Sequence, residues 1–169
     1  ETFKDLRVLD MSNVIAGPTI GAMLARMGAE VIKIDPVSPF YGPGVTVLYG
    51  IVVNIGKQSL LLNVSRPDGR EFLNTLIRDS DVIIINSTPR SLERIGMTHA
   101  ELREINPRIL LARFDAWGGP AEAGEYANFV GYDDNIQAGI GIMERFGGGL
   151  ETCEEHAHIG TIDVIAGVA

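Results

Sequence analysis

The carboxylate of Asp163 stands in a setting that suits covalent chemistry. It lies two residues after Thr161, a predicted N-cap of a last apolar helix, among the apolar residues Ile162, Val164 and Ile165. The positive end of a helix stabilises an ionised carboxylate, and apolar neighbours keep water sparse. Covalent catalysis by aspartate requires a shielded, ionised carboxylate of this kind. The alternative is that Asp163 only complements the helix dipole, as most such aspartates do.

A glycine-bearing turn precedes the first predicted helix. Gly17 and Gly21 bracket the helix start, where free backbone N–H groups favour a phosphate or a carboxylate. Asp35 comes 18 residues after Gly17, at the spacing of the ribose-binding acid in dinucleotide-binding folds. However, the Gly-x-Gly-x-x-Gly fingerprint is absent and Pro18 removes one N–H donor. A tight strand-to-helix turn is therefore favoured over an NAD site.

Three cationic side chains could bind an anion. Lys57 follows a glycine, but the segment 54–59 is too short for a Walker loop. Lys57 could contact a phosphate as a point charge, or it could be a solvated lysine at the start of a strand. Arg90 and Arg94 are one helical turn apart after a buried strand, where they could hold an anion together. The alternative is that Arg94 pairs with Glu93 or Asp81.

The stretch 153–158 contains soft metal-ligand types. Cys153, His156 and His158 are close in sequence, but a zinc site usually takes further ligands from elsewhere, and the remaining histidine is His99. A polar loop is favoured, and we expect no metal site.

Alternating strands and helices must position these residues. Five apolar runs predict strands, at 7–11, 30–35, 59–64, 81–86 and 109–114. The third and fourth runs are nearly continuous, which is typical of strands covered on both faces of a parallel sheet. The order predicts an α/β fold with a doubly wound, Rossmann-like, mostly parallel sheet, whose ligands bind at the carboxyl ends of the strands.

Helical patterns lie between the strands. Ile20, Met23, Leu24 and Met27 form one apolar stripe, which Gly28 ends. Capping-box-like starts are predicted at 65–68, with Pro67 in the first turn, and at 98–101. A further helix is predicted over 128–143, followed by a glycine-rich break at 146–149.

The composition limits which kinds of molecule the chain could bind and in which compartment it could work. The chain has 169 residues with a formal net charge of −8, which argues against nucleic acid and against an anionic membrane surface. The single cysteine fits a reducing compartment, and we find neither a leader nor an apolar run near 18 residues, so we expect a cytoplasmic protein. Both ends stop abruptly, and we interpret the chain as a segment of a longer protein.

The whole chain resembles the class III CoA-transferase family, also called the CaiB–BaiF family. The matching stretches occur in order, at 6–10, 16–18, 28–35, 54–57, 69–70, 81–82, 94–96, 106–108, 131–133 and 160–163. The resemblance implies that residues 1–169 are the N-terminal, CoA-binding α/β domain of a larger enzyme. It further implies that a second, smaller domain and a returning C-terminal segment are missing, that the full-length enzyme is an interlocked homodimer, and that this segment alone is inactive.

The resemblance also implies roles for single residues. Asp163 is similar to the family's nucleophile, which attacks an acyl-CoA, passes through a mixed anhydride and an aspartyl-CoA thioester, and transfers CoA to a small carboxylate. The CoA site then comprises Asn13, Val14, Ile15, Ala16, Gly17, Lys57, Arg90, Arg94 and Tyr132. Coenzyme A enters as acyl-CoA co-substrate, with no metal.

Some residues depart from the family pattern, and two alternative functions are weighed against CoA transfer. Related α-methylacyl-CoA racemases have a histidine where Tyr132 stands, and tyrosine is a poor base at neutral pH, which weakens a racemase or isomerase function. Gln58 and Val37 replace arginines of some transferases, and Ile15 replaces a polar residue of oxalate-type enzymes.

The other alternative is a non-catalytic nucleotide- or CoA-binding domain. The runs 113–120 and 154–158 are similar to dimethylsulfoniopropionate CoA-transferase/lyases. Neither the acyl donor nor the acceptor follows from the sequence.

Overall fold

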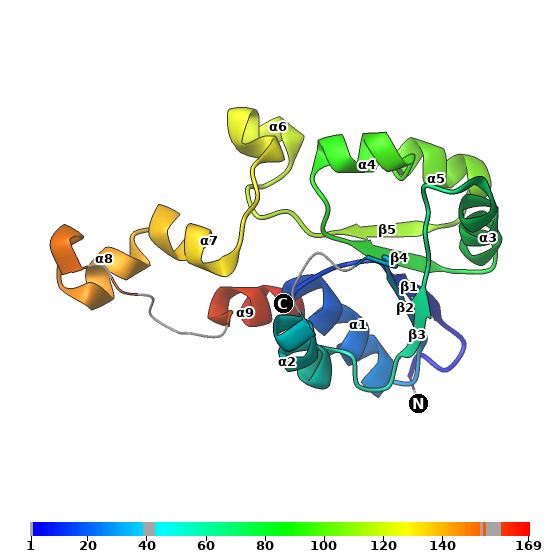
Figure 1. Ribbon diagram of the computed structural model, residues 1–169, viewed down its shortest axis with the longest axis horizontal. Helices are drawn as coiled ribbons and strands as arrows, with labels where there is room; N and C mark the ends of the chain where they lie inside the picture. Colours follow the sequence, from blue (N-terminus) through cyan, green and yellow to red (C-terminus); the bar gives the residue numbers. More distant parts are fainter. Residues whose placement is uncertain (1, 39–42, 153, 155–159) are drawn as a thin grey trace.

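Five parallel strands form the centre of the protein (Figure 1). The computed structural model describes residues 2–38, 43–152, 154 and 160–169. The sheet has the order β3-β2-β1-β4-β5, and every neighbouring pair is parallel. The strands are β1 (Arg7–Asp10), β2 (Glu30–Asp35), β3 (Gln58–Leu61), β4 (Val82–Ile85) and β5 (Leu110–Arg113). The predicted α/β class and doubly wound parallel sheet are confirmed.

Helices cover both faces of this sheet. On one face α3 (Pro67–Arg78), α4 (Pro89–Ile95) and α5 (His99–Ile105) pack over the larger core cluster, which includes Leu9, Leu73, Ile83, Leu92 and Leu102. On the other face α1 (Ala16–Arg26) packs over a smaller cluster built on Val8, Ala29, Val31 and Ile84. β1 lies between β2 and β4, so the chain reverses its direction of winding at the β1–β4 boundary, which is where ligands bind in such sheets.

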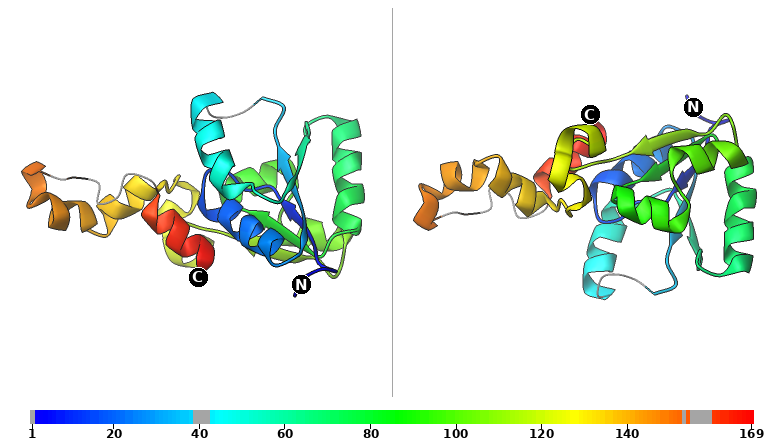
Figure 2. Two further views of the ribbon diagram at one scale, coloured as in Figure 1. Left: turned by 90° about the horizontal axis from the view of Figure 1, so that it is seen from below. Right: turned by 90° about the horizontal axis from the view of Figure 1, so that it is seen from above.

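The remaining helices lie along one side and beyond the sheet. α2 (Pro43–Val53) and α9 (Thr161–Val168) flank α1, whereas α7 (Asp133–Gly139) and α8 (Ile142–Gly147) project away from the sheet (Figures 1 and 2). The connecting segment contains α6 (Pro120–Ala123) and the 3₁₀ turn Gly124–Asn128; a second 3₁₀ turn spans Leu150–Thr152. Within the described ranges, none of the helices is long and apolar enough to cross a bilayer.

Two local predictions are confirmed, two are wrong, and one helix was not predicted. Thr98 and Glu101 form a complete capping box, and Gly28 has a positive φ of 103° just after α1. Pro67 opens α3, but Arg66 is its N-cap without a side-chain bond, so the predicted capping box at 65–68 is wrong. The predicted helix over 128–143 is broken, because Gly141 at φ 78° separates α7 from α8. α2 is almost uniformly apolar and carries no amphipathic stripe, so the sequence pattern did not reveal it.

Candidate active site

A cavity of about 240 Å³ opens where β1, β4 and β5 end. Asn13, Val14 and Ala16 line it after β1, and Asn86, Ser87 and Thr88 line it after β4. The segment following β5 adds Phe114 to Trp117, and Ser91, Ala127, residues 129–132 and Asp163 complete the wall. The cavity therefore sits at the point where the sheet reverses its winding, as the strand pattern predicted.

The turn at Val14 is strained and braced. Val14 has φ 68°, the one positive value outside glycine among the described residues, and a β-branched side chain disfavours this left-handed region by about 1–3 kcal/mol. Asn86 holds the preceding residue, Asn13, by both of its backbone groups: the Asn13 N–H donates to Asn86 Oδ1 at 2.9 Å, and Asn86 Nδ2 donates to the Asn13 carbonyl at 2.8 Å. Sequence reasoning did not single out Asn86 as a site residue, because its partner is 73 residues away.

The replacement Asn86→Ala is expected to relax this turn. Both hydrogen bonds to Asn13 are lost, at about 0.5–1.5 kcal/mol each, and Val14 is released toward an unstrained conformation. Turnover should fall roughly tenfold or more in steady-state kinetics. Asn74→Ala is the matched control, since Asn74 bonds Arg70 on α3, away from the cavity. Equal activities for the two variants would contradict a bracing role.

α9 is docked tightly on the start of α1. A Cβ at Gly167 would come within 2.6 Å of the Ala16 carbonyl oxygen and 2.8 Å of Thr19 Cβ, so only glycine permits this contact. At the other end, Gly160 is the N-cap with φ 54°, and a Cβ there would meet Ile15 Cδ1 at 2.5 Å. The predicted N-cap role of Thr161 is therefore wrong, because Thr161 is the first residue within the helix. This docking brings Asp163 to the cavity beside Val14 and Ala16.

The environment of Asp163 raises its pKa to about 6. Burial is the first cause, and the carboxylates of Asp133 and Asp134 add to it. These effects outweigh the dipole of the short α9, whose stabilising effect the sequence led us to expect. At pH 7 a carboxyl group with this pKa is still about nine-tenths ionised. Asp163 thus combines an ionised state with unusual basicity.

A comparison with known proteins identifies the family. The sequence model of CoA-transferase family III matches residues 3–169. The chain belongs to this family. It is 46% identical over 164 residues to the CoA-transferase/lyase DddD of Marinomonas sp. (strain MWYL1), covering 97% of the chain and 19% of that relative. It is 36% identical over 154 residues to a formyl-CoA:oxalate CoA-transferase of Streptomyces avermitilis, covering 87% of the chain and 37% of that relative.

Solved structures of similar proteins agree with the fold. A CAIB/BAIF family protein from Brucella suis superposes with a TM-score of 0.82 at 26% identity, covering 99% of the chain and 47% of that structure. The hypothetical protein Rv3272 from Mycobacterium tuberculosis gives 0.84 at 26% identity, covering 98% of the chain and 47% of that structure. The chain therefore spans less than half the length of these relatives.

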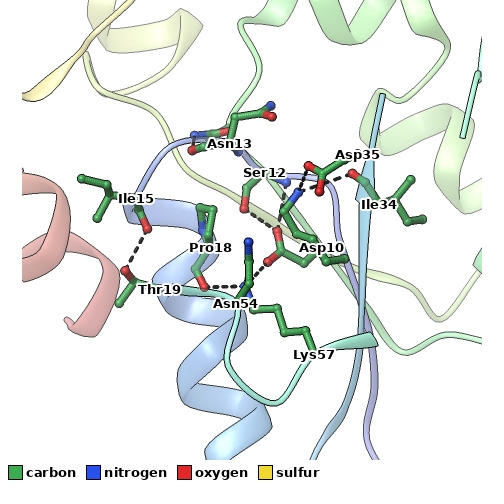
Figure 3. Close-up of polar contacts among 12 residues, drawn as sticks. Asp10, Ser12, Asn13, Ile15, Pro18, Thr19, Ile34, Asp35, Asn54 and Lys57 are labelled. Atoms are coloured by element: carbon green, nitrogen blue, oxygen red, sulfur yellow. Dashed lines mark hydrogen bonds and ion pairs between the residues drawn. The ribbon is translucent and has the colours of Figure 1, made fainter. Parts of the chain in front are cut away.

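Lys57 of this family III chain is turned inward. Its ammonium group donates to Asp10 Oδ2 at 2.6 Å, to the Pro18 carbonyl at 2.7 Å and to Asn54 Oδ1 at 3.1 Å (Figure 3). The side chains of Lys57 and Asp10 are only 1% and 0% exposed. Burial lowers the pKa of Lys57, and the charge of Asp10 opposes that effect. The contact with CoA stays a prediction, and this geometry points instead to a role in holding the start of α1.

The two predicted arginines lie beside a neighbouring cavity. Arg94 lines a space of about 390 Å³ at the ends of β1, β2 and β3, which shares Asn13, Ser87 and Ser91 with the first cavity. Arg90 and Arg94 are both exposed and also share one surface groove. Among the described residues Arg94 forms no ion pair with Glu93 or Asp81. Of the residues described on the wall of this second cavity, Arg94 is the one with a cationic side chain, and Asp35 adds a carboxylate, so the contact of Arg90 and Arg94 with CoA stays a prediction.

The other predicted site residues lie at the start of α1 and on the cavity wall. Ile15, Ala16 and Gly17 are buried at the start of α1, while Asn13, Val14 and the exposed Tyr132 line the cavity. Tyr132 precedes Asp133, a buried carboxylate that sequence reasoning gave no separate role. In the ranges that the structure describes, no cluster of three or more His, Cys, Asp and Glu is placed to hold a metal ion. Cys153, His156 and His158 lie outside those ranges.

Proposed function

We propose that this chain carries the catalytic aspartate and the CoA-handling cavity of an acyl-CoA:carboxylate CoA-transferase that works through an aspartyl-CoA thioester. The observation that carries the proposal is Asp163 itself, half-buried, basic, and facing a cavity at the reversal point of the sheet. Membership of CoA-transferase family III and the names of the relatives support the reaction class.

In the first half of the proposed reaction, an Asp163 oxygen attacks the carbonyl carbon of the acyl-CoA thioester. The carbon–sulfur bond breaks, CoA leaves as thiolate, and a mixed anhydride between Asp163 and the acyl group remains. The thiolate then attacks the Asp163 carbonyl carbon, which releases the first carboxylate and leaves an aspartyl-CoA thioester. Each step exchanges one acyl link for another, so the reaction needs no external oxidant or reductant.

The second half repeats these steps in reverse order with a new acid. The acceptor carboxylate attacks the aspartyl-CoA carbonyl carbon, and CoA leaves as thiolate. A new mixed anhydride then joins Asp163 to the acceptor acid. The thiolate attacks the carbonyl carbon that belongs to the acceptor. Product acyl-CoA departs and Asp163 is restored. Negative charge develops on a carbonyl oxygen in every step, and backbone N–H groups are the donors that stabilise it. The start of α1 has no side-chain cap, so its N–H groups near Val14 are suited to that role.

The racemase alternative has no support in the site. That reaction needs a second base opposite the aspartate, and Tyr132 occupies the position where the resemblance puts histidine. A domain that only binds nucleotide or CoA is also disfavoured. Burial raises the pKa of Asp163, and titratable groups with such shifted pKa values in a cavity are typical of catalytic sites. We further propose that the full-length protein is a cytoplasmic, interlocked homodimer with a second domain, and that the segment alone is inactive.

Trapping the covalent intermediate tests the proposal. The full-length protein is incubated with an acyl-CoA, analysed intact by mass spectrometry, and then treated with hydroxylamine, which cleaves anhydrides and thioesters. We expect an adduct of CoA or acyl mass on the peptide containing Asp163, which hydroxylamine removes. A racemase would instead exchange the α-proton with deuterated water and give no adduct. An unmodified protein under turnover conditions would contradict the transferase assignment.

A further inference from the structure

Asp133 is a buried carboxylate in direct contact with the backbone of Asp163. It begins α7 and is only 6% exposed. Its Oδ2 accepts a hydrogen bond from the Asp163 N–H at 2.9 Å, and its Oδ1 accepts one from the amide of Gln137, a residue that is 1% exposed. Both oxygens are therefore engaged, and the orientation of the carboxylate is fixed.

This contact ties two separate helices together at the reacting group. α7 and α9 lie side by side although Asp133 and Asp163 are 30 residues apart (Figures 1 and 2). The N–H that Asp133 accepts is in the first turn of α9, where helical N–H groups have no partner within the helix. The bond thus fixes the rotation of α9 at the residue whose side chain lines the cavity.

Asp133 also places a second negative charge near Asp163. Among the charges acting on Asp163, that of Asp133 is the larger and that of Asp134 the smaller, and both raise the pKa of Asp163. Of the other titratable groups on the cavity wall, Asp115 is paired with Arg113 at 2.8 Å and Tyr132 is a phenol. The start of α1, from Asn13 to Gly17, contributes no titratable side chain. Residues 155–159 lie outside the described ranges.

We propose that Asp133 is a positioning residue of this site, which aims Asp163 through its backbone N–H and destabilises the negative charge on the Asp163 carboxylate before reaction. The inference rests on the proposed function, because it takes Asp163 as the attacking group. When Asp163 becomes an anhydride or a thioester, its charge disappears and so does the repulsion from Asp133. The covalent intermediate is therefore favoured relative to the free Asp163 carboxylate. A more basic carboxylate is also the better nucleophile.

The test separates the hydrogen bond from the charge. Asp133→Asn keeps an oxygen for the Asp163 N–H and can still bond a reoriented Gln137 amide, but it removes the charge. The pKa of Asp163 should then fall from about 6 toward its ordinary value. Since the ionised form reacts, the acidic limb of the kcat/KM profile should move to lower pH, by roughly one unit at most because burial, the larger cause, remains. The rate at pH 7 should fall several-fold, because a less basic carboxylate is a weaker nucleophile. Asp133→Ala also loses the bond, and its loss of activity should be at least tenfold greater.

Controls make the outcome specific. Asp134→Asn removes an exposed charge without touching the bond, so a smaller shift in the same direction is expected. If Asp133→Asn fails to fold, Asp133→Ser carries the same expectation for the pH profile. A merely structural role predicts lower activity with an unmoved acidic limb, and that result would overturn the inference.

A second readout does not depend on turnover. The carboxyl carbons of ¹³C-labelled aspartate in the full-length protein can be titrated by NMR, with Asp163→Asn assigning the resonance of interest. A downward shift of the Asp163 midpoint in Asp133→Asn supports the charge effect of Asp133 on Asp163 whether or not a covalent adduct forms, whereas a missing adduct overturns the proposed function and with it the catalytic benefit of that effect. An unchanged midpoint, together with a normal adduct in the unmodified protein, would overturn the inference and leave the proposed function intact.

Discussion

Replacing Asp163 by asparagine is expected to abolish CoA transfer, lowering kcat/KM by at least about 10⁴-fold. The amide keeps the shape of the side chain, and the bond to Asp133 persists because it is made by the backbone N–H of residue 163. An amide oxygen carries no full negative charge, however, and cannot attack a thioester at a comparable rate. Steady-state kinetics on the full-length protein, with adduct detection by mass spectrometry, measures the effect.

The same variant is expected to be more stable than the unmodified protein at neutral pH. Asp163 has a folded-state pKa of about 6, raised above its ordinary value of 3.8, so the folded state binds more protons between these values. The stability that Asp163 contributes is thus lost as the pH rises from about 4 to about 6. Asp163→Asn removes this loss, and its thermal midpoint should exceed that of the parent above pH 6 but not below pH 4.

Opposite changes in activity and stability mark a group retained for chemistry. Asp79→Asn is the matched control, because Asp79 is exposed at the end of α3, and it should leave both properties unchanged. Two results would count against the catalytic role of Asp163: more than a tenth of the parental kcat/KM in Asp163→Asn, or a loss of stability at pH 7.

Much of the scaffold is encoded locally and was predictable. The strand around Ile83 and Ile84 is short and uniformly apolar, which suits a sheet covered on both faces, and the structure buries both side chains completely. The same expectation for the run 59–64 is wrong, because β3 is an edge strand and stays largely exposed. The helix at Thr98 begins where its side chain can accept from the Glu101 N–H, a contact spanning only three residues. Such features depend on neighbours in sequence, so a sequence pattern reveals them.

The parts that could not be predicted are contacts between distant residues. Asn86 braces a turn 73 residues away, Lys57 pairs with a carboxylate 47 residues away, and Asp133 reaches across 30 residues. Each of these side chains is polar in a sequence position that equally suits a solvated residue. Only the folded sheet, by bringing strand ends together, decides between the two. The identity of Asp163 as a candidate was predictable, whereas its raised pKa depends on burial in the folded protein and on the charges of Asp133 and Asp134.

Replacing Lys57 by methionine is expected to cost about 3–5 kcal/mol of folding free energy, the range for breaking a buried ion pair from one side. The Asp10 carboxylate would remain fully buried, bonded to Ser12 but without its cation, and the carbonyl of Pro18 would lose its donor. For a chain of this size the thermal midpoint should fall by roughly 6–20 °C. Differential scanning calorimetry or thermal denaturation by circular dichroism measures it.

This variant also decides between two roles for Lys57. A lysine that contacts a CoA phosphate from the surface would, when replaced, raise KM for acyl-CoA and leave stability nearly unchanged. The buried pair predicts instead a large loss of stability and little change in KM for acyl-CoA. The double variant Asp10→Asn/Lys57→Met should regain part of the lost stability, because no unpaired buried charge remains. Arg66→Met breaks an exposed pair with Asp68 and should cost no more than about 1 kcal/mol. Because Lys57 bonds the first turn of α1, a stable fold with a raised KM would show that the ammonium leaves Asp10 to meet the substrate.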